Sequence, residues 1–232
     1  MKGKLYLVPV TLGTEDYKEV IPADVVERVK QLRKFVVEDL RSARRFLRMI
    51  DKDFPIDKSE FQILNEHTTE RELEDIVKEI GGENDTGLLS EAGVPCVADP
   101  GSALVRLAHR KAVRVVPLTG PSSILLALMA SGMNGQKFMF NGYIPIRGNE
   151  RSRYIRNMES EARKGIAQVF IEAPYRNKKL LDDLLDTCLP DTELCLAVNI
   201  TAHDEFIKTL SIKNWKAQIP DINKKPAIFI LG

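Results

Sequence analysis

The stretch SEAGVPCVADPG, residues 90–101, places two acids, two glycines and two prolines between a strand-like run and a helical pattern. Glycine lets a backbone approach a ligand closely, and proline fixes the path of the chain. Such a loop presents N–H and C=O groups at fixed positions, where they can bind a purine edge or a carboxylate. Asp99 in this loop can cap the following helix or contact a cation. The plainer alternative is a tight turn that only joins a strand to a helix.

Similar loops follow other predicted strands, at residues 8–14 (VPVTLGT), 36–41 (VVEDLR) and 117–123 (PLTGPSS). Ligands of open α/β sheets bind outside the carboxyl ends of the strands, so these loops together predict a ligand cleft. The first strand is not followed by G-x-G-x-x-G, and the sequence has no G-x-x-x-x-G-K-[ST]. We therefore do not expect an ordinary dinucleotide site or a P-loop.

Composition is that of a globular protein, with 44% hydrophobic and 29% charged residues in a chain of 232. No apolar run approaches the ~18–20 residues of a membrane span, and the amino-terminal apolar run is too short for a signal peptide. We therefore expect a cytoplasmic protein without a membrane partner. The three cysteines and three histidines lack ligand spacing, so no metal site is predicted.

Strand-like and helical patterns alternate along the chain, which predicts an α/β fold with mainly parallel or mixed sheets. We expect two α/β domains, residues 1–117 and 118–232. The predicted strands lie at residues 5–8, 35–37, 62–64, 87–89, 113–117, 137–143, 167–173, 193–200 and 226–231.

Several motifs resemble, in order, those of the tetrapyrrole methylase superfamily, which uses S-adenosylmethionine. They most resemble the branch of small-subunit rRNA cytidine 2′-O-methyltransferases. The matching segments are PVTLGT (9–14), VEDLR (37–41), SEAGVPCVADPG (90–101), PLTGPS (117–122), FMFNGYIP (138–145) and EAPYR (172–176).

The resemblance implies a tetrapyrrole methylase fold, with the cofactor S-adenosyl-L-methionine in a cleft between two α/β domains, and a homodimer. It also implies which residues border that donor. They are Pro9, Gly93, Val94, Asp99, Pro100, Gly101, Ser122, Ser123 and Ala227.

Transfer of a methyl group from a sulfonium needs alignment first, and proximity can supply up to ~7–11 kcal/mol. A carboxylate can take the proton of a hydroxyl acceptor, and Glu38, Asp39 and Glu172 are the candidates on family-matching loops. Each can instead cap a helix or pair with Arg41 or Arg176. These two arginines and Arg147 are predicted to bind the substrate, since guanidinium groups bind phosphate well.

Formal net charge is +1, so any nucleic-acid binding must come from local patches. Two stretches are basic, RSARRFLRMIDK (41–52) and IRGNERSRYIR (146–156). In the first, Arg41, Arg44, Arg45 and Arg48 fall on one side of a helix. RNA phosphates attract such patches, although for each patch taken alone a solvated helix face is the favoured explanation. The expected partner is rRNA or the small ribosomal subunit.

Two other functions stay open. A methylase of a tetrapyrrole or another small molecule needs a broad apolar cleft and has no use for arginine patches. A catalytically altered homologue that binds the donor or RNA is favoured by VNITA, residues 198–202, which stands where the family has R-E-L-T-K.

Overall fold

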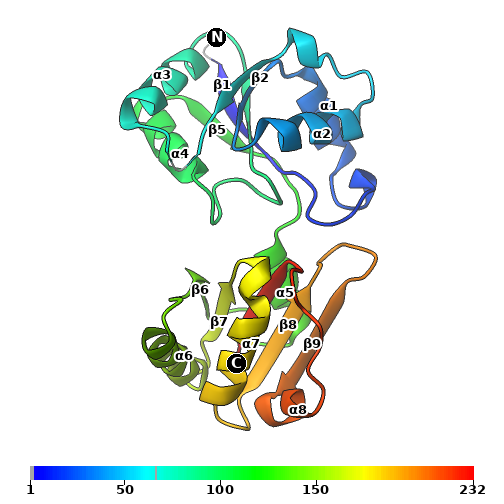
Figure 1. Ribbon diagram of the computed structural model, residues 1–232. Helices are drawn as coiled ribbons and strands as arrows, with labels where there is room; N and C mark the ends of the chain where they lie inside the picture. The colour runs from blue at the N-terminus through cyan, green and yellow to red at the C-terminus, as the bar shows by residue number, and fades with distance from the viewer. Residues whose placement is uncertain (1–2, 66) are drawn as a thin grey trace. The chain divides into compact units, whose positions relative to one another are not determined.

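Short runs rich in Val, Leu, Ile and Phe in the first half of the chain form one parallel sheet, ordered β3-β2-β4-β1-β5 (Figure 1). The structure is a computed structural model that describes residues 3–65 and 67–232. The strands are β1 (Lys4–Val8), β2 (Lys34–Val37), β3 (Glu60–Ile63), β4 (Thr86–Leu89) and β5 (Arg114–Pro117). β4 is buried at every position, as expected of a central parallel strand covered on both faces.

Four helices cover the two faces of this sheet. α1 (Ala23–Gln31) and α2 (Leu40–Ile50) pack on one face, and α3 (Glu70–Ile80) and α4 (Gly101–Arg110) on the other. Two of the four helices begin at a side-chain cap, whereas α1 and α4 each begin directly after a proline. The Asp39 side chain caps α2, and a capping box between Thr69 and Glu72 begins α3.

The second half of the chain forms a mixed sheet ordered β6-β7-β10-β8-β9, in which only β6 and β7 run parallel. Its helices α6, α7 and α8 share one apolar core, and α5 packs against β8, β9 and β10. The strands are β6 (Phe138–Tyr143), β7 (Ala167–Ile171), β8 (Glu193–Val198), β9 (Phe206–Ser211) and β10 (Ala227–Leu231). The helices are α5 (Ser123–Ser131), α6 (Gly148–Ala162), α7 (Asn177–Thr187) and α8 (Ile212–Ala217).

The chain divides into two compact units, Met1–Ser122 and Ser123–Gly232. The loop after β5 belongs to the first unit, because the Leu118 amide donates to the Leu7 carbonyl and Gly120 packs on Pro9. The predicted α/β class with parallel and mixed sheets is confirmed. The sequence patterns missed β9 and α8. None of the helices in the described residues is long and apolar enough to cross a membrane.

Candidate functional site

The loops predicted to bind a ligand all leave the first sheet at the carboxyl ends of its strands, which we call the carboxyl edge. Val8 and Val37 both pair with Leu89 across neighbouring strands, and Leu7 pairs with Pro117. The chain segments that follow β1, β2, β4 and β5 therefore begin at nearly the same level. This carboxyl edge is where parallel sheets bind their ligands.

The loop between β4 and α4 has an unusual backbone. Gly93, Cys96 and Ala98 all take left-handed conformations, with φ values of 70°, 70° and 61°. Left-handed φ is uncommon for non-glycine residues and is a form of local strain that often marks functional sites. Asp99 holds the turn, since its Oδ1 accepts from the Cys96 amide at 2.8 Å and from the Gly101 amide at 2.9 Å.

Three of these loops touch one another. The Val10 amide donates to the Gly93 carbonyl at 2.9 Å. A Cβ added at Gly93 would lie 2.9 Å from Leu12 Cδ2 and 3.2 Å from the Pro121 carbonyl oxygen. Only glycine fits this meeting point without strain, because the position also has a left-handed φ.

Pro9 is also in close contact with a neighbouring loop at a glycine. A Cβ added at Gly120 would lie 2.1 Å from the Pro9 Cβ, so the loop after β5 closes directly over the loop after β1. The structure thus gathers the predicted donor residues Pro9, Gly93 and Asp99 at one edge. Val94, Pro100 and Ser122 belong to the same loops, and Gly101 is the first residue of α4.

Carboxylates gather at this edge. Burial raises the pKa of Glu38 above its ordinary value, and the charges of Glu91 and Asp99 add to the rise. Burial likewise raises the pKa of Asp99, against the lowering effect of its two amide hydrogen bonds. Among the residues that the structure describes, no cationic side chain forms an ion pair with Glu38. Such a carboxylate takes up a proton more readily than an ordinary glutamate.

Asp39 has a different role from its neighbour. It caps α2, accepting from the Ser42 amide at 2.7 Å and the Ser42 hydroxyl at 2.8 Å. These hydrogen bonds lower the pKa of Asp39, so it favours the charged form. The sequence analysis did not include Glu91 among the candidate site residues, although its charge helps to raise the pKa of Glu38. Its place in the loop with Asp99 was the available signal.

The second unit brings its own predicted residues to one edge of its sheet. Glu172 follows β7, and Ala227 begins β10 and pairs with Val198 at the end of β8. Ile228 pairs with both Ile171 and Ala197, which sets these strand ends at one level. Ser123 is the first residue of α5. Arg147 is exposed just before α6.

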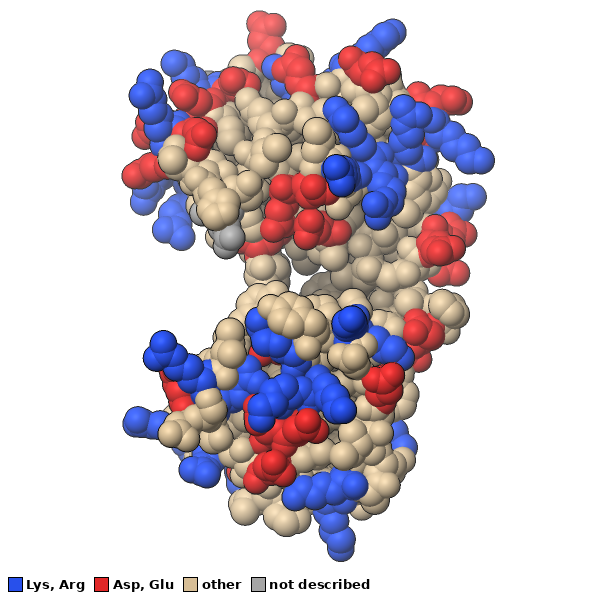
Figure 2. Space-filling view, in the orientation of Figure 1, with Lys and Arg blue, Asp and Glu red and all other residues tan. Residues whose placement is uncertain are grey.

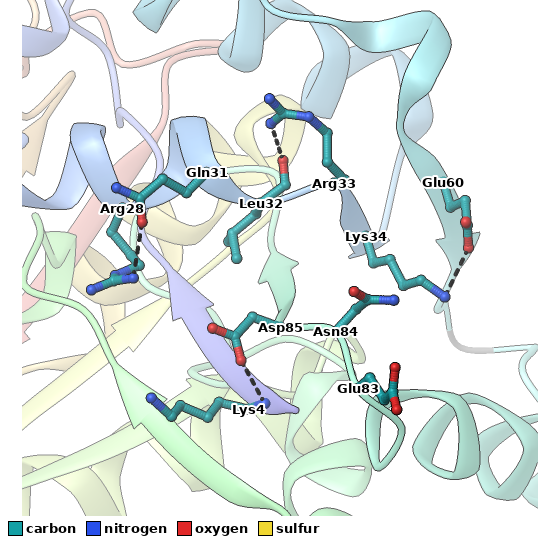
Figure 3. Close-up of a pocket in the computed structure, with 10 residues that line it drawn as sticks. All are labelled: Lys4, Arg28, Gln31, Leu32, Arg33, Lys34, Glu60, Glu83, Asn84 and Asp85. Atoms are coloured by element: carbon teal, nitrogen blue, oxygen red, sulfur yellow. Dashed lines mark hydrogen bonds and ion pairs between the residues drawn. The ribbon is translucent and has the colours of Figure 1, made fainter. Parts of the chain in front are cut away.

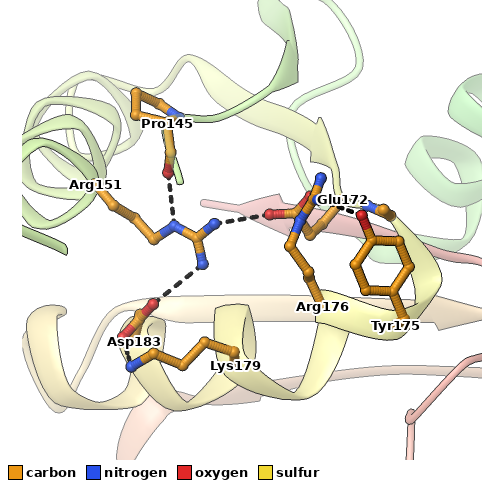
Figure 4. Close-up of polar contacts among 8 residues, drawn as sticks. Pro145, Arg151, Glu172, Tyr175, Arg176, Lys179 and Asp183 are labelled. Carbon is orange, nitrogen blue, oxygen red and sulfur yellow. Dashed lines mark hydrogen bonds and ion pairs between the residues drawn. The ribbon is translucent and has the colours of Figure 1, made fainter. Parts of the chain in front are cut away.

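Glu172 lies in a buried ion-pair network (Figure 4). Its Oε2 accepts from Arg151 Nη2 at 2.8 Å, and its Oε1 accepts from Arg176 Nε and the Ala173 amide, each at 2.8 Å. Burial alone raises the pKa of Glu172, but the hydrogen bonds from Arg176 and Ala173 and the charges of both arginines outweigh it. The net pKa is lowered, which disfavours proton uptake.

Arg151 was expected in an exposed basic cluster, and this was wrong. Its side chain is 2% exposed, donates to the Pro145 carbonyl at 2.6 Å and pairs with Asp183 at 3.1 Å. The reason is helical periodicity, because Arg151 shares the inward face of α6 with Ile155, Met158 and Ala162. Of the three predicted substrate residues, Arg176 forms an ion pair with Glu172, whereas Arg41 and Arg147 are exposed.

A pocket of ≈ 540 Å³ opens at the opposite, amino edge of the first sheet (Figure 3). Several charged side chains that line this pocket already have hydrogen-bond or ion-pair partners close by. Lys34 pairs with Glu60 at 3.1 Å, Asp85 accepts from the Lys4 backbone, and Arg28 donates to Gln31. It lacks the glycine and proline loops of the carboxyl edge, which remains the candidate site. No cluster of potential metal ligands occurs in residues 3–65 and 67–232.

The family model described as Tetrapyrrole (Corrin/Porphyrin) Methylases matches residues 4–215. The chain is 30% identical to "Ribosomal RNA small subunit methyltransferase I" of Vibrio cholerae, over 98% of this chain and 75% of that protein. It is also 30% identical to the Thermotoga maritima protein of the same name, over 89% of this chain and 87% of the relative. The Haemophilus influenzae protein of that name is 28% identical over 100% of this chain and 79% of its own length.

Among solved structures, the chain resembles the crystal structure of the methyltransferase CobJ. The TM-score is 0.62, with 17% sequence identity, and the match covers 99% of this chain and 94% of the other. At this identity the likeness supports the fold alone.

Proposed function

Because this chain belongs to the tetrapyrrole methylase family, and within it to the branch of small-subunit rRNA methyltransferase I, we propose that it transfers a methyl group from S-adenosylmethionine to a ribose 2′-hydroxyl of small-subunit rRNA. The chain is a methyltransferase, as are its relatives by name. The observation that carries the proposal is the carboxyl edge of the first sheet, where a strained loop and half-buried carboxylates meet.

The residues of this edge fit S-adenosylmethionine in charge. The donor carries a sulfonium, an ammonium and a carboxylate, so its net charge is positive, and the edge offers the carboxylates of Glu38, Glu91 and Asp99. Backbone groups of the loop around Gly93 and Asp99 are the proposed contacts for its polar groups. When bound there, the donor supplies a methyl carbon activated by positive sulfur. The predicted donor contacts of Ser123 and Ala227, which the second unit carries, stay predictions.

Glu38 is the proposed general base. It would accept the proton of the attacking hydroxyl as the hydroxyl oxygen bonds to the methyl carbon and the bond from that carbon to sulfur breaks, with the electron pair going to sulfur. Its raised pKa suits this role, because a base works best when its pKa lies near the working pH. Asp39 and Glu172 serve less well, since hydrogen bonds lower the pKa of both. Asp99 instead fixes the shape of the loop, because its carboxylate accepts hydrogen bonds from the Cys96 and Gly101 amides.

An RNA substrate is supported by the names of the relatives and by exposed Arg41 and Arg147. The test offers purified protein and radiolabelled donor to small ribosomal subunits, naked rRNA and a tetrapyrrole precursor. We expect label in RNA, at a ribose located by mass spectrometry. Label in the macrocycle instead contradicts the RNA assignment, and donor binding without any label contradicts the activity.

We also propose a homodimer. α5 has the sequence SILLALMAS, with no charged residue, yet Leu125 is 51% and Met129 79% exposed. A helix that is apolar all round is normally covered, and a second copy of the chain is the proposed cover. Light scattering should give twice the chain mass for the wild type and a monomer for Leu125→Lys with Met129→Lys. A monomeric wild type contradicts the dimer.

A further inference from the structure

One face of α2 carries an unneutralised set of arginines, which we call the α2 arginine face: Arg41, Arg44, Arg45 and Arg48. All four are exposed, whereas Ala43, Phe46, Leu47 and Ile50 on the other side of the helix are buried. Figure 2 shows basic side chains gathered over α1 and α2. The helix forms because its apolar side is buried in the core of the first unit.

Nothing within the described part of the chain balances these charges by direct pairing. No ion pair joins any of the four arginines to a carboxylate there. Other helices do pair their surface charges, as Lys30 with Glu27 in α1 and Lys179 with Asp183 in α7. Exposed cations near α4 also lack an ion pair among the described residues, so what distinguishes the α2 arginine face is that four unpaired arginines share one side of a single helix.

The arrangement also works against helix stability. The arginines stand three and four residues apart, so like charges are neighbours on the helix surface, which is unfavourable. Arg41 lies in the first turn, where the helix dipole already presents positive charge. The capping Asp39 offsets part of the charge at the N-terminus, but α2 itself contains no carboxylate that relieves the repulsion among the arginines, and a bound polyanion does so.

Geometry favours a nucleic-acid backbone as that polyanion. The face spans eight residues of helix, a rise of about 10 Å from Arg41 to Arg48, and one strand of a DNA duplex carries a charge every ~3.4 Å along the axis. A cation–π contact with Phe61 orients the Arg44 side chain, whose guanidinium carbon lies 5.4 Å from the centre of the ring. α2 also begins directly after Glu38 and Asp39, so the face continues from the candidate site.

We propose that the α2 arginine face binds the phosphate backbone of the RNA substrate and holds it beside the carboxyl edge of the first sheet. The inference rests on the proposed function in taking the substrate to be RNA. The contact is with phosphates, so it supplies affinity and orientation without reading the base sequence.

The test measures binding of naked small-subunit rRNA at several salt concentrations, without donor. Arg44→Ala/Arg45→Ala/Arg48→Ala is compared with Arg106→Ala/Arg110→Ala/Lys111→Ala, a control that removes exposed cations from the α4 region. For the α2 variant we expect a Kd raised tenfold or more, and a salt slope reduced by about 2 to 3 for three lost phosphate contacts. The control should bind as the wild type does.

Folding and donor binding separate this inference from its alternatives. The melting temperature of the α2 variant should stay close to that of the wild type, because the relieved repulsion offsets the lost contact between Arg44 and Phe61. Arg45→Glu/Arg48→Glu keeps the contact between Arg44 and Phe61 and should also lose RNA affinity. If wild-type protein binds RNA and the α2 variants match it in Kd and salt slope, this inference fails while the proposed function stands. If the wild type binds donor but not RNA, both fail.

Discussion

Glu38 follows β2 in the first unit and Glu172 follows β7 in the second, yet these two strand-end glutamates have opposite surroundings. Glu38 is half-buried beside Glu91 and Asp99, and its pKa is raised by burial and by their charges. Glu172 is buried between Arg151 and Arg176, and its pKa is lowered despite burial. Residue type and place on a strand therefore do not decide what a carboxylate does. Its charged neighbours do.

The comparison suggests a division of roles. A carboxylate among other carboxylates has a raised pKa and accepts a proton more readily than an isolated one, which is useful in a reaction. A carboxylate held by two guanidinium groups fixes structure, here by joining the segment after β7 to α6 and α7. We interpret Glu38 as part of the reaction machinery and Glu172 as a buried clamp, a side chain that holds elements of the fold together. Substitutions at the two glutamates test this division.

Glu38→Gln should have the largest effect. Removing a general base typically lowers kcat by about 10²–10⁴-fold, whereas donor affinity should fall much less, because Glu91 and Asp99 keep their carboxylates at the donor edge. The base must be ionised, so the wild-type rate should rise with pH through the raised pKa of Glu38, above the ordinary glutamate range. Steady-state kinetics across pH measure both. Full activity in Glu38→Gln contradicts its role as base.

Glu172→Ala should mainly affect stability. Removing one partner of a buried ion pair costs about 3–5 kcal/mol when the other charge is left unpaired, and we expect a loss at the lower end of this range, because Arg151 keeps its pair with Asp183. Both side chains of the pair with Arg151 are at most 2% exposed. Urea unfolding measures the loss, and Lys179→Ala, which removes an exposed partner of Asp183, should change the free energy of unfolding by only ~0–1 kcal/mol. Equal effects of the two substitutions contradict a clamp at Glu172.

Asp99→Ala should weaken donor binding by about tenfold, or ~1.4 kcal/mol. It releases the Cys96 and Gly101 amides, which set the course of the loop between β4 and α4. Calorimetric titration with S-adenosylmethionine measures the affinity. Asp57→Ala, at an exposed aspartate outside the site, is the matched control and should bind donor normally.

The smallest effect expected is a gain in stability. The folded-state pKa of Glu38 is raised, so at neutral pH the folded protein holds a charge that the unfolded chain accommodates better. Glu38→Gln should therefore be more stable than wild type at neutral pH. The difference should vanish below the unfolded-state pKa, where Glu38 is protonated in both states. Denaturant midpoints at two pH values measure it, and a loss of stability at neutral pH contradicts the assigned surroundings.

Much of the fold followed from local patterns. The period of apolar residues in α2 separates buried Phe46 and Leu47 from the arginines in the sequence as it does in the structure. The loops at the carboxyl edge were also predictable, since Gly, Pro and Asp mark turns. β9 was not predicted, because FIKTLS lies at the sheet edge and alternates only weakly. α8 is six residues long, too short for a helical period to appear.

The electrostatics of the site could not be predicted in the same way. Arg151 looks like a surface residue in sequence, and its partners Glu172 and Asp183 lie 21 and 32 residues away along the chain. The left-handed Cys96 and Ala98 give no local signal, because that conformation is typical of glycine and asparagine. Both features depend on distant parts of the fold, which hold a charge or a strained backbone in place.

The central claim is that the loops at the carboxyl edge of the first sheet seat the methyl donor. Amide hydrogen exchange with and without S-adenosylhomocysteine tests it most directly, because backbone groups are the proposed contacts. We predict slower exchange at residues 90–101 and no change at residues 83–85, beside the pocket at the amino edge. Protection at residues 83–85, with residues 90–101 unaffected, would contradict the account.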